Sequence, residues 1–432
     1  MIFDAGIILV LSFLGLLIIG VPIGICIAVS SAVTILMALP AEIAIFTTAQ
    51  KMVSSLDSFT LLAVPFFILS GVLMNNGGIA LRLVNFAKLF SGRIPGSLAH
   101  TNIVGNMMFG AISGSAIAAS TSIGGVMVPM SEKEGYSRPF AASANIASAP
   151  TGMLIPPTTA FILYALASGG TSISALFAGG LIAGCLWGAG CMLVAYITAR
   201  SRGYATRVNL RNASVRRIIL DALPSLFLIV IIIGGIVLGI FTAVEASAIS
   251  VIYTMFLTLI VYRTIDVRSF ITSLIKATET TGVIMFLLAA SAAMSFAMSI
   301  TGLPSALSMA ILGLSDNPAM VLLIITLMLL IIGCFMDIGP AILIFTPILL
   351  PITSAIGVDP IHFGIIMVFN LCIGTITPPV GTGLFVGAGI AKEQVENLLL
   401  PLMPFYLVIL VTLLLITYVP QITLFLPRIM GL

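Results

Sequence analysis

The sequence contains very little charge. Only 7% of its 432 residues are Asp, Glu, Lys or Arg, whereas 60% are hydrophobic. A soluble domain carries about 25% charged residues, so this composition excludes an ordinary soluble protein. At roughly 20 residues for each membrane-spanning helix, the length allows about ten crossings. The sequence therefore predicts an all-α polytopic membrane protein.

Histidine and cysteine are also scarce. His100 and His362 are the only histidines, and the five cysteines include no Cys-x-x-Cys pair. No metal-ligand cluster, phosphate loop, nucleotide fingerprint or nucleophile–base pair is visible. We therefore expect no enzymatic activity, no organic cofactor and no nucleic-acid partner. The apolar segment 1–20 has no basic leader region, so we interpret it as a retained span.

One motif occurs twice. Gly152–Pro157 and Gly374–Pro379 both read Gly-x-x-x-Pro-Pro, 222 residues apart, and Pro129 and Pro351 keep the same offset. Two adjacent prolines remove two amide donors and break a helix. In hydrocarbon, the freed carbonyls are tolerated only where protein or a water-filled cavity receives them. Broken helices at corresponding positions of two halves indicate a transporter binding site.

Apolar segments form two sets, separated by a basic stretch. Positively charged loops of membrane proteins stay in the cytoplasm, so residues 200–217 are expected to be a cytoplasmic linker. This linker contains Arg200, Arg202, Arg207, Arg211, Arg216 and Arg217. The predicted spans are residues 3–19, 21–38, 58–76, 137–168 and 175–199 before the linker, and 218–240, 242–262, 279–299, 360–388 and 401–426 after it.

Two further segments are expected to begin and end on one side of the membrane. Counting the spans outward from the linker places two groups of basic residues in the cytoplasm. The first group is Arg82, Lys88 and Arg93, and the second is Lys133 and Arg138. Between these groups, residues 97–131 predict a re-entrant hairpin. The matching hairpin, residues 319–352, enters from the outside. We therefore predict an inverted repeat of residues 1–199 and 218–432, with broken helices at 137–168 and 360–388.

The first predicted hairpin turns at Gly110–Ala116. Its small residues allow close backbone approach, and serine oxygens are suitable ligands for a hard cation. Packing alone is a second explanation, because small residues favour helix contacts in any membrane protein. Three nearby asparagines are candidates for hydrogen bonds between helices, namely Asn102, Asn106 and Asn145.

The second predicted hairpin turns at Gly333–Pro340 and contains Asp337. A charged side chain at bilayer depth costs at least about 2.5–3.5 kcal/mol. Asp337 should persist there only if it is paired, protonated or neutralised by a cation, which indicates a role in transport. A capping Asp at the turn is the other interpretation, and the two are compatible. Glu245 lies near the start of its span, where a charge is tolerated.

Each proline pair also exposes backbone carbonyls, and Thr158 and Thr377 add hydroxyls nearby. Such ligands without a charge cluster suit Na⁺ better than a divalent ion. A proton relay needs an intramembrane carboxylate or histidine, which only Asp337 offers, in one half. Neither turn and neither break contains Lys or Arg. A carboxylate substrate would then be bound by helix amino ends, hydroxyls and cations.

Taken together, four motifs resemble those of the large membrane subunit (DctM or SiaM type) of TRAP transporters, the tripartite ATP-independent periplasmic transporters. They are Phe109–Ala116, the segment from Pro129 to Tyr136, Ile155–Pro157 and Gly374–Pro379. The resemblance extends over essentially the whole chain. It implies an elevator-type fold of the ion-transporter superfamily, Na⁺-driven secondary uptake and a place in the bacterial inner membrane.

The resemblance also implies site residues. The Na⁺ sites would be formed by Ser113, Ser115, Gly152, Ile155 and Thr158 in the first half, and by Gly333, Asp337, Gly374, Thr377 and Val380 in the second. The substrate site would be formed by Ser113, Gly114, Ser115, Asp337, Thr375 and Thr377.

Two partner proteins follow from the same resemblance. They are a small four-helix membrane subunit of the DctQ or SiaQ type, expected as a separate chain, and a periplasmic substrate-binding protein of the DctP or SiaP type. Membrane lipid is the third partner. The implied cargo is an organic acid, such as a C4-dicarboxylate, sialic acid or a sugar acid. The alternatives are a stand-alone Na⁺/carboxylate symporter of the same superfamily and, from another class, a gated channel.

Overall fold

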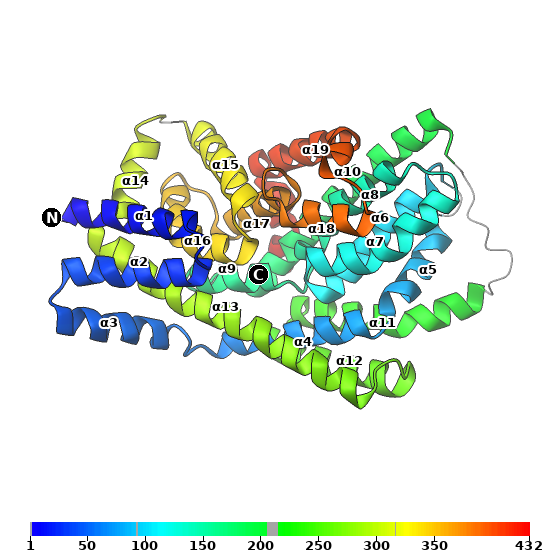
Figure 1. Ribbon diagram of the computed structural model, residues 1–432, viewed down its shortest axis with the longest axis horizontal. Helices are drawn as coiled ribbons and strands as arrows, with labels where there is room; N and C mark the ends of the chain where they lie inside the picture. The colour runs from blue at the N-terminus through cyan, green and yellow to red at the C-terminus, as the bar shows by residue number, and fades with distance from the viewer. Residues whose placement is uncertain (1, 92–93, 205–214, 316) are drawn as a thin grey trace.

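The computed structural model describes residues 2–91, 94–204, 215–315 and 317–432, and these ranges are built from helices joined by short turns (Figure 1). In these ranges, eight helices are long and apolar enough to cross a membrane, judged by length and composition. The predicted class, an all-α polytopic membrane protein, is confirmed. Arg93 and two arginines of the predicted linker, Arg207 and Arg211, lie outside the described residues.

The first part of the chain is helical. In Figure 1 the first three helices run side by side at the end of the molecule that carries the N-terminus. Two helices of this part, at 41–54 and 79–91, are not among the predicted spans, because Glu42, Lys51, Arg82 and Lys88 interrupt their apolar runs. The elements are α1 (Ile2–Ile18), α2 (Ile23–Ala38), α3 (Ala41–Ser54), η1 (Phe59–Leu62), α4 (Ala63–Asn76) and α5 (Ile79–Ser91).

The rest of the first half contains a hairpin, a broken helix and a long helix. The hairpin arms α6 and α7 pack on each other, and both contact η2, the short turn of helix at the break. Gly114 supplies the sharp turn between the arms with a φ of 60°, a conformation that glycine adopts without strain. The elements are α6 (Ser97–Ser113), α7 (Ala116–Lys133), α8 (Arg138–Ser148), η2 (Ala149–Met153), α9 (Thr159–Ala167) and α10 (Ile173–Arg202).

The second half repeats this order. Its elements are α11 (Val215–Val237), α12 (Ala243–Met255), the π-helix η3 (Phe256–Val261), α13 (Val267–Thr301), α14 (Leu303–Leu312), α15 (Pro318–Phe335), α16 (Ile338–Ala355), α17 (Pro360–Ile376), α18 (Thr382–Ala391), α19 (Val395–Tyr418) and α20 (Pro420–Ile429). The pair α15 and α16 forms the second hairpin, and α17 and α18 form the second broken helix.

Two predicted spans have the wrong bounds. The span predicted at 279–299 is α13, which starts at Val267, because Asp266 caps it by accepting a hydrogen bond from Ser269 N. The span predicted at 401–426 is two helices, α19 and α20, since Pro420 lacks the amide that would continue the first. His362 holds this break, with Nε2 3.3 Å from the carbonyl oxygen of Thr417.

The two halves interlock. Helix α2 of the first half packs against α13 of the second, and α12 packs against α4. Near the breaks, a segment of each half also packs against the hairpin of the other half. Helix α9 packs against α16 of the second hairpin, and α18 packs against α7 of the first hairpin. Each hairpin is therefore held by broken-helix segments from both halves.

Candidate substrate and cation site

The first hairpin lies directly on the first break. A Cβ added to Gly110 of α6 would lie 2.2 Å from the Cα of Gly152, and one added to Gly152 would lie 2.3 Å from the Cα of Gly110. The two backbones therefore meet with no side chain between them. At the turn, a Cβ on Gly114 would lie 3.2 Å from the carbonyl oxygen of Pro157. The hairpin tip is thus seated against the backbone of the break, beside the carbonyl oxygen of Pro157.

The second half contains the same contact. A Cβ on Gly374 of α17 would lie 2.2 Å from the carbonyl carbon of Gly333, and one on Gly333 would lie 3.2 Å from the Cα of Gly374. Gly110 lies three residues, and Gly333 two residues, before the end of the first arm of its hairpin. Both Gly-x-x-x-Pro-Pro elements therefore open with a glycine that contacts its own hairpin.

The structure brings the predicted residues of the first half together. Ser113 ends α6, and Ser115 caps α7 by accepting a hydrogen bond from Ala118 N at 3.3 Å. Across the break, the fully buried Thr158 caps α9 by accepting a hydrogen bond from Phe161 N at 3.3 Å. Two hydroxyl caps and the amino ends of two helices thus converge at the tip, where the helix ends favour an anionic group of a substrate and the hydroxyl oxygens can accept a cation.

Buried hydrogen bonds fix the break in place. Asn145 of α8 donates to the carbonyl oxygen of Ser120 on α7 at 3.1 Å, and Asn106 of α6 donates to Asn145 Oδ1 at 3.0 Å. The expected hydrogen bonds between helices are therefore present at these asparagines. The carbonyl oxygen of Ala147 accepts from Trp187 Nε1 at 2.7 Å, so the long helix α10 satisfies a group that the broken helix leaves free.

The predicted residues of the second half are less closely gathered. Thr375 and Thr377 donate to carbonyls of their own helix, at 2.7 Å each. Asp337 occupies the N-cap position of α16 but makes no side-chain N-cap hydrogen bond. Among the described hydrogen bonds, none joins Asp337 to either threonine. Ile155 of the first half is buried, whereas Val380 is 44% exposed.

Asp337 instead faces a cavity of about 1100 Å³. Its walls come from the α1–α2 joint, from Thr159 and Leu163 of α9, from α13 and from the second hairpin tip. A second carboxylate lines the same cavity, Glu279 of α13, and both side chains are exposed to it. Sequence reasoning missed Glu279 because it lay at the predicted start of a span, whereas α13 begins three turns earlier at Val267.

Glu245 is explained by a local contact. Its carboxylate accepts a hydrogen bond from Thr242 N at 2.8 Å, and Glu245 N donates to Thr242 Oγ1 at 3.2 Å. This reciprocal capping box fixes the start of α12. Glu245 therefore serves as a helix cap here.

A hairpin seated against a broken helix, present twice in one helical membrane chain, is the arrangement expected of a secondary transporter. The fold is similar to that of the YdaH transporter of Alcanivorax borkumensis, with a TM-score of 0.66 over 87% of this chain and 88% of that chain, at 14% identity. This comparison supports the fold alone, that of a polytopic helical membrane protein.

The family follows from the sequence comparisons. Residues 10–422 match the family described as the tripartite ATP-independent periplasmic transporter, DctM component. The chain is 37% identical to the sialic acid TRAP transporter large permease protein SiaM of Vibrio cholerae, covering 97% of both chains. It is 39% identical to the isethionate TRAP transporter permease protein DctMQ of Oleidesulfovibrio alaskensis, covering 95% of this chain and 64% of that protein. The chain belongs to the DctM family, the large permeases of TRAP transporters.

Proposed function

We propose that this chain is the large permease of a Na⁺-driven importer of an organic acid, working by an elevator mechanism in the bacterial inner membrane. The observation that carries the proposal is the repeated glycine contact, Gly110 with Gly152 and Gly333 with Gly374. It ties each hairpin to the broken helix of its own half. Hairpins and broken helices can then move as one body, with α4 and α13 as part of the fixed scaffold.

Sodium coupling is supported by the chemistry of the tips. Ser113, Ser115 and Thr158 offer neutral oxygens beside the carbonyls of the first break, a donor set that suits Na⁺. In the second half, Asp337 adds a carboxylate at the cavity it shares with Glu279. An organic anion entering that cavity meets two negative charges, so bound cations are required to neutralise them. Because the organic anion binds only together with these cations, its uptake depends on Na⁺.

The partners are part of the proposal. The isethionate relative is named DctMQ, which supports a DctQ-type small subunit as a partner. A DctP-type periplasmic binding protein would deliver the substrate. The substrate class, a carboxylate or sulfonate, is supported by the sialic acid and isethionate named in the relatives' descriptions.

Reconstitution tests the proposal. The chain and its small subunit are placed in proteoliposomes, and the binding protein is added with a radiolabelled ligand identified by thermal-shift screening of organic acids. We expect uptake that requires inward Na⁺, the small subunit and the binding protein. Equal uptake on a proton gradient without Na⁺ would refute the coupling, and full uptake without the binding protein would support the stand-alone symporter. Non-saturable flux would support a channel.

A further inference from the structure

The tip of the first hairpin touches the scaffold helix α4 at a glycine. A Cβ added to Gly71 of α4 would lie 2.8 Å from the carbonyl oxygen of Ser113 and 3.4 Å from the Cα of the same residue. Ser113 ends the first hairpin arm, α6, and is one of the predicted substrate and cation residues. Because a Cβ atom does not come this close to a backbone oxygen, any larger residue at position 71 would push the hairpin tip away.

A side-chain contact lies one helical turn further along α4. Asn75 Oδ1 accepts a hydrogen bond from the hydroxyl of Ser122, which belongs to the second hairpin arm, α7. Residues that are four apart lie on the same face of a helix, so Gly71 and Asn75 present one face of α4 to the hairpin. We call these two residues the α4 docking point. It contacts both arms of the first hairpin.

Other residues of α4 hold this helix to the second half of the chain. The hydroxyl oxygen of Ser70 lies 3.0 Å from Thr254 Oγ1 of α12, and Asn76 Nδ2 donates a hydrogen bond to Ser273 Oγ of α13 at 2.8 Å. Each of these residues is next in sequence to a residue of the α4 docking point. Helix α4 is therefore bonded to two scaffold helices on one side and to the hairpin on another, so the docking point lies on the boundary between scaffold and hairpin.

The second hairpin meets its scaffold helix differently. Helix α4 contacts the first arm of its hairpin, α6, whereas α13 contacts the second arm of the other hairpin, α16. A Cβ added to Gly282, the glycine of α13, would have no atom within 4 Å, and Asp337 at the second tip faces a cavity. A contact that the fold requires recurs in both repeats, as the glycine contact between hairpin and break does. The α4 docking point belongs to one repeat, which indicates a contact that forms in one state of the carrier.

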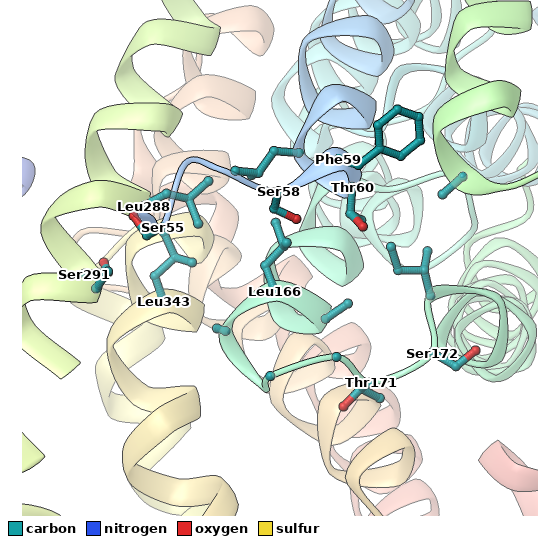
Figure 2. Close-up of a pocket in the computed structure, with 18 of the residues that line it drawn as sticks. Ser55, Ser58, Phe59, Thr60, Leu166, Thr171, Ser172, Leu288, Ser291 and Leu343 are labelled. Atoms are coloured by element: carbon teal, nitrogen blue, oxygen red, sulfur yellow. The ribbon is translucent and has the colours of Figure 1, made fainter. Parts of the chain in front are cut away.

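Near the start of α4, a cavity of about 830 Å³ separates the scaffold from the broken helix of the first half. Figure 2 shows Ser58 and Thr60 beside α4 on one side of this cavity and Leu166 of α9 on the opposite side. The cavity gives the hairpins and broken helices room to shift along α4. Leu61 lines the cavity and lies ten residues before Gly71, which corresponds to roughly 15 Å along a helix.

We propose that Gly71 and Asn75 are positioning residues that hold the first hairpin tip in the state seen here and release it when the hairpins cross the membrane. This inference rests on the proposed elevator mechanism. Release breaks the hydrogen bond between Asn75 and Ser122 and moves the tip along α4 toward Leu61. Neither residue of the docking point lines the Asp337 cavity. The docking point therefore sets the ratio of the docked and released states through the hairpin, without a contact to substrate in that cavity.

Two pairs of cysteines in a cysteine-free background test the release. Asn75→Cys with Ser122→Cys joins the scaffold to the hairpin, and the matched pair Asn76→Cys with Ser273→Cys joins α4 to α13 inside the scaffold. A short bifunctional thiosulfonate should cross-link both pairs. Na⁺-dependent uptake into proteoliposomes should fall at least about tenfold for the first pair, because a cross-linked hairpin cannot leave the docked state. A reducing agent should restore this uptake, and cross-linking of the second pair should leave uptake unchanged.

Spin labels measure the populations of the two states. Leu62→Cys at the start of α4 and Ile117→Cys beside the tip are suitable sites, because the native side chains are 46% and 43% exposed. Double electron–electron resonance should give two distances between the labels, the shorter one in the released state. Under Na⁺ and substrate conditions that populate both states, Gly71→Ala should lower the ratio of docked to released protein about fivefold to a hundredfold. Gly234→Ala on α11, where no atom lies within 4 Å of the added Cβ, should leave the ratio unchanged.

The possible outcomes separate the docking point from the transport mechanism. Full uptake by the cross-linked Asn75–Ser122 pair, or a wild-type ratio of the two distances in Gly71→Ala, would overturn the docking point. If Gly71→Ala does not fold, the cysteine pairs still decide, because they retain Gly71. Loss of uptake on cross-linking Asn76 to Ser273, or a single distance in the wild type under every condition, would instead refute the elevator mechanism.

Discussion

Thr158 and Val380 occupy the same position of the two repeats, 222 residues apart, but only Thr158 caps the helix that follows its break. Its hydroxyl accepts from Phe161 N at 3.3 Å and is fully buried, whereas the Val380 side chain is 44% exposed. Ile155 and Thr377 form a second equivalent pair, and in this pair the hydroxyl belongs to the second half. The two breaks thus offer different oxygens at equivalent places, so the two proposed cation sites are not chemically identical.

This asymmetry gives a first prediction. Thr158→Val keeps the shape and removes the capping oxygen, so stability should fall by about 1 kcal/mol. If the same oxygen binds Na⁺, the Na⁺ concentration for half-maximal uptake should rise roughly threefold to tenfold. Val380→Thr is the matched control and should change stability by less than about 0.5 kcal/mol. An unchanged Na⁺ dependence in Thr158→Val would remove Thr158 from the cation site.

The glycine contact gives a second prediction. In Gly152→Ala the new Cβ would lie 2.3 Å from the Cα of Gly110, so hairpin and break must separate. Overpacking of this kind costs about 1–3 kcal/mol, and uptake should be lost. Gly125→Ala, on α7 with no atom within 4 Å of its added Cβ, should be tolerated. Thermal unfolding in detergent and uptake in proteoliposomes measure both effects, and a normal Gly152→Ala protein would contradict the close contact.

Asp337 gives a third prediction. Since its side chain makes no N-cap hydrogen bond, Asp337→Asn should leave the melting temperature nearly unchanged. Transport should fall sharply, because the cavity loses the charge that attracts the coupling cation. Melting temperature and Na⁺-dependent uptake are measured on the same preparation. Uptake at the wild-type rate would show that transport does not need the charge of Asp337.

The buried asparagines give a fourth prediction. Asn106→Ala leaves Asn145 with an unsatisfied group, and Asn145→Ala does the same to Asn106 and Ser120. Each substitution should destabilise the protein by about 1–3 kcal/mol. The double variant should cost less than the sum, since neither partner is then left unpaired. Strict additivity in unfolding experiments would show that the three helices α6, α7 and α8 are held by other contacts.

Membrane topology gives a fifth prediction. Ala116 and Ile338 are the obvious positions for probing the two tips, but they are only 5% and 2% exposed. Ile117, 43% exposed, and Gly339, which lines the Asp337 cavity, are better positions. In a cysteine-free background, an impermeant thiol reagent should reach Gly339→Cys from the periplasm and Ile117→Cys from the cytoplasm. Labelling of both from one side, unaffected by Na⁺ or substrate, would contradict the inverted repeat and alternating access.

The sequence predicts the hairpins and breaks well because their signals are local. Prolines at 156, 157, 378 and 379 interrupt helices wherever they occur, and small residues mark the turns. It could not predict that Gly110 meets Gly152, because contacts between distant segments leave no mark on hydropathy. Amphipathic helices such as α5 were missed for a related reason. Arg82 and Lys88 lower the mean hydropathy, although Leu83 and Ala87 of the same helix are buried.

Glu279 shows the same limit in the candidate site. From the sequence it is a charge at the edge of an apolar segment, where charges are common. Only the early start of α13, set by the Asp266 cap, places it deep in the helix beside the Asp337 cavity.

The contacts that each half makes with the hairpin of the other half have a consequence for how the protein folds during synthesis. Helix α9 packs on the second hairpin and α18 on the first. When only the first repeat has been synthesised, its hairpin therefore lacks the contacts that α18 provides. The first hairpin can complete its packing only after α18 has been synthesised, so the two halves cannot fold one after the other as separate domains.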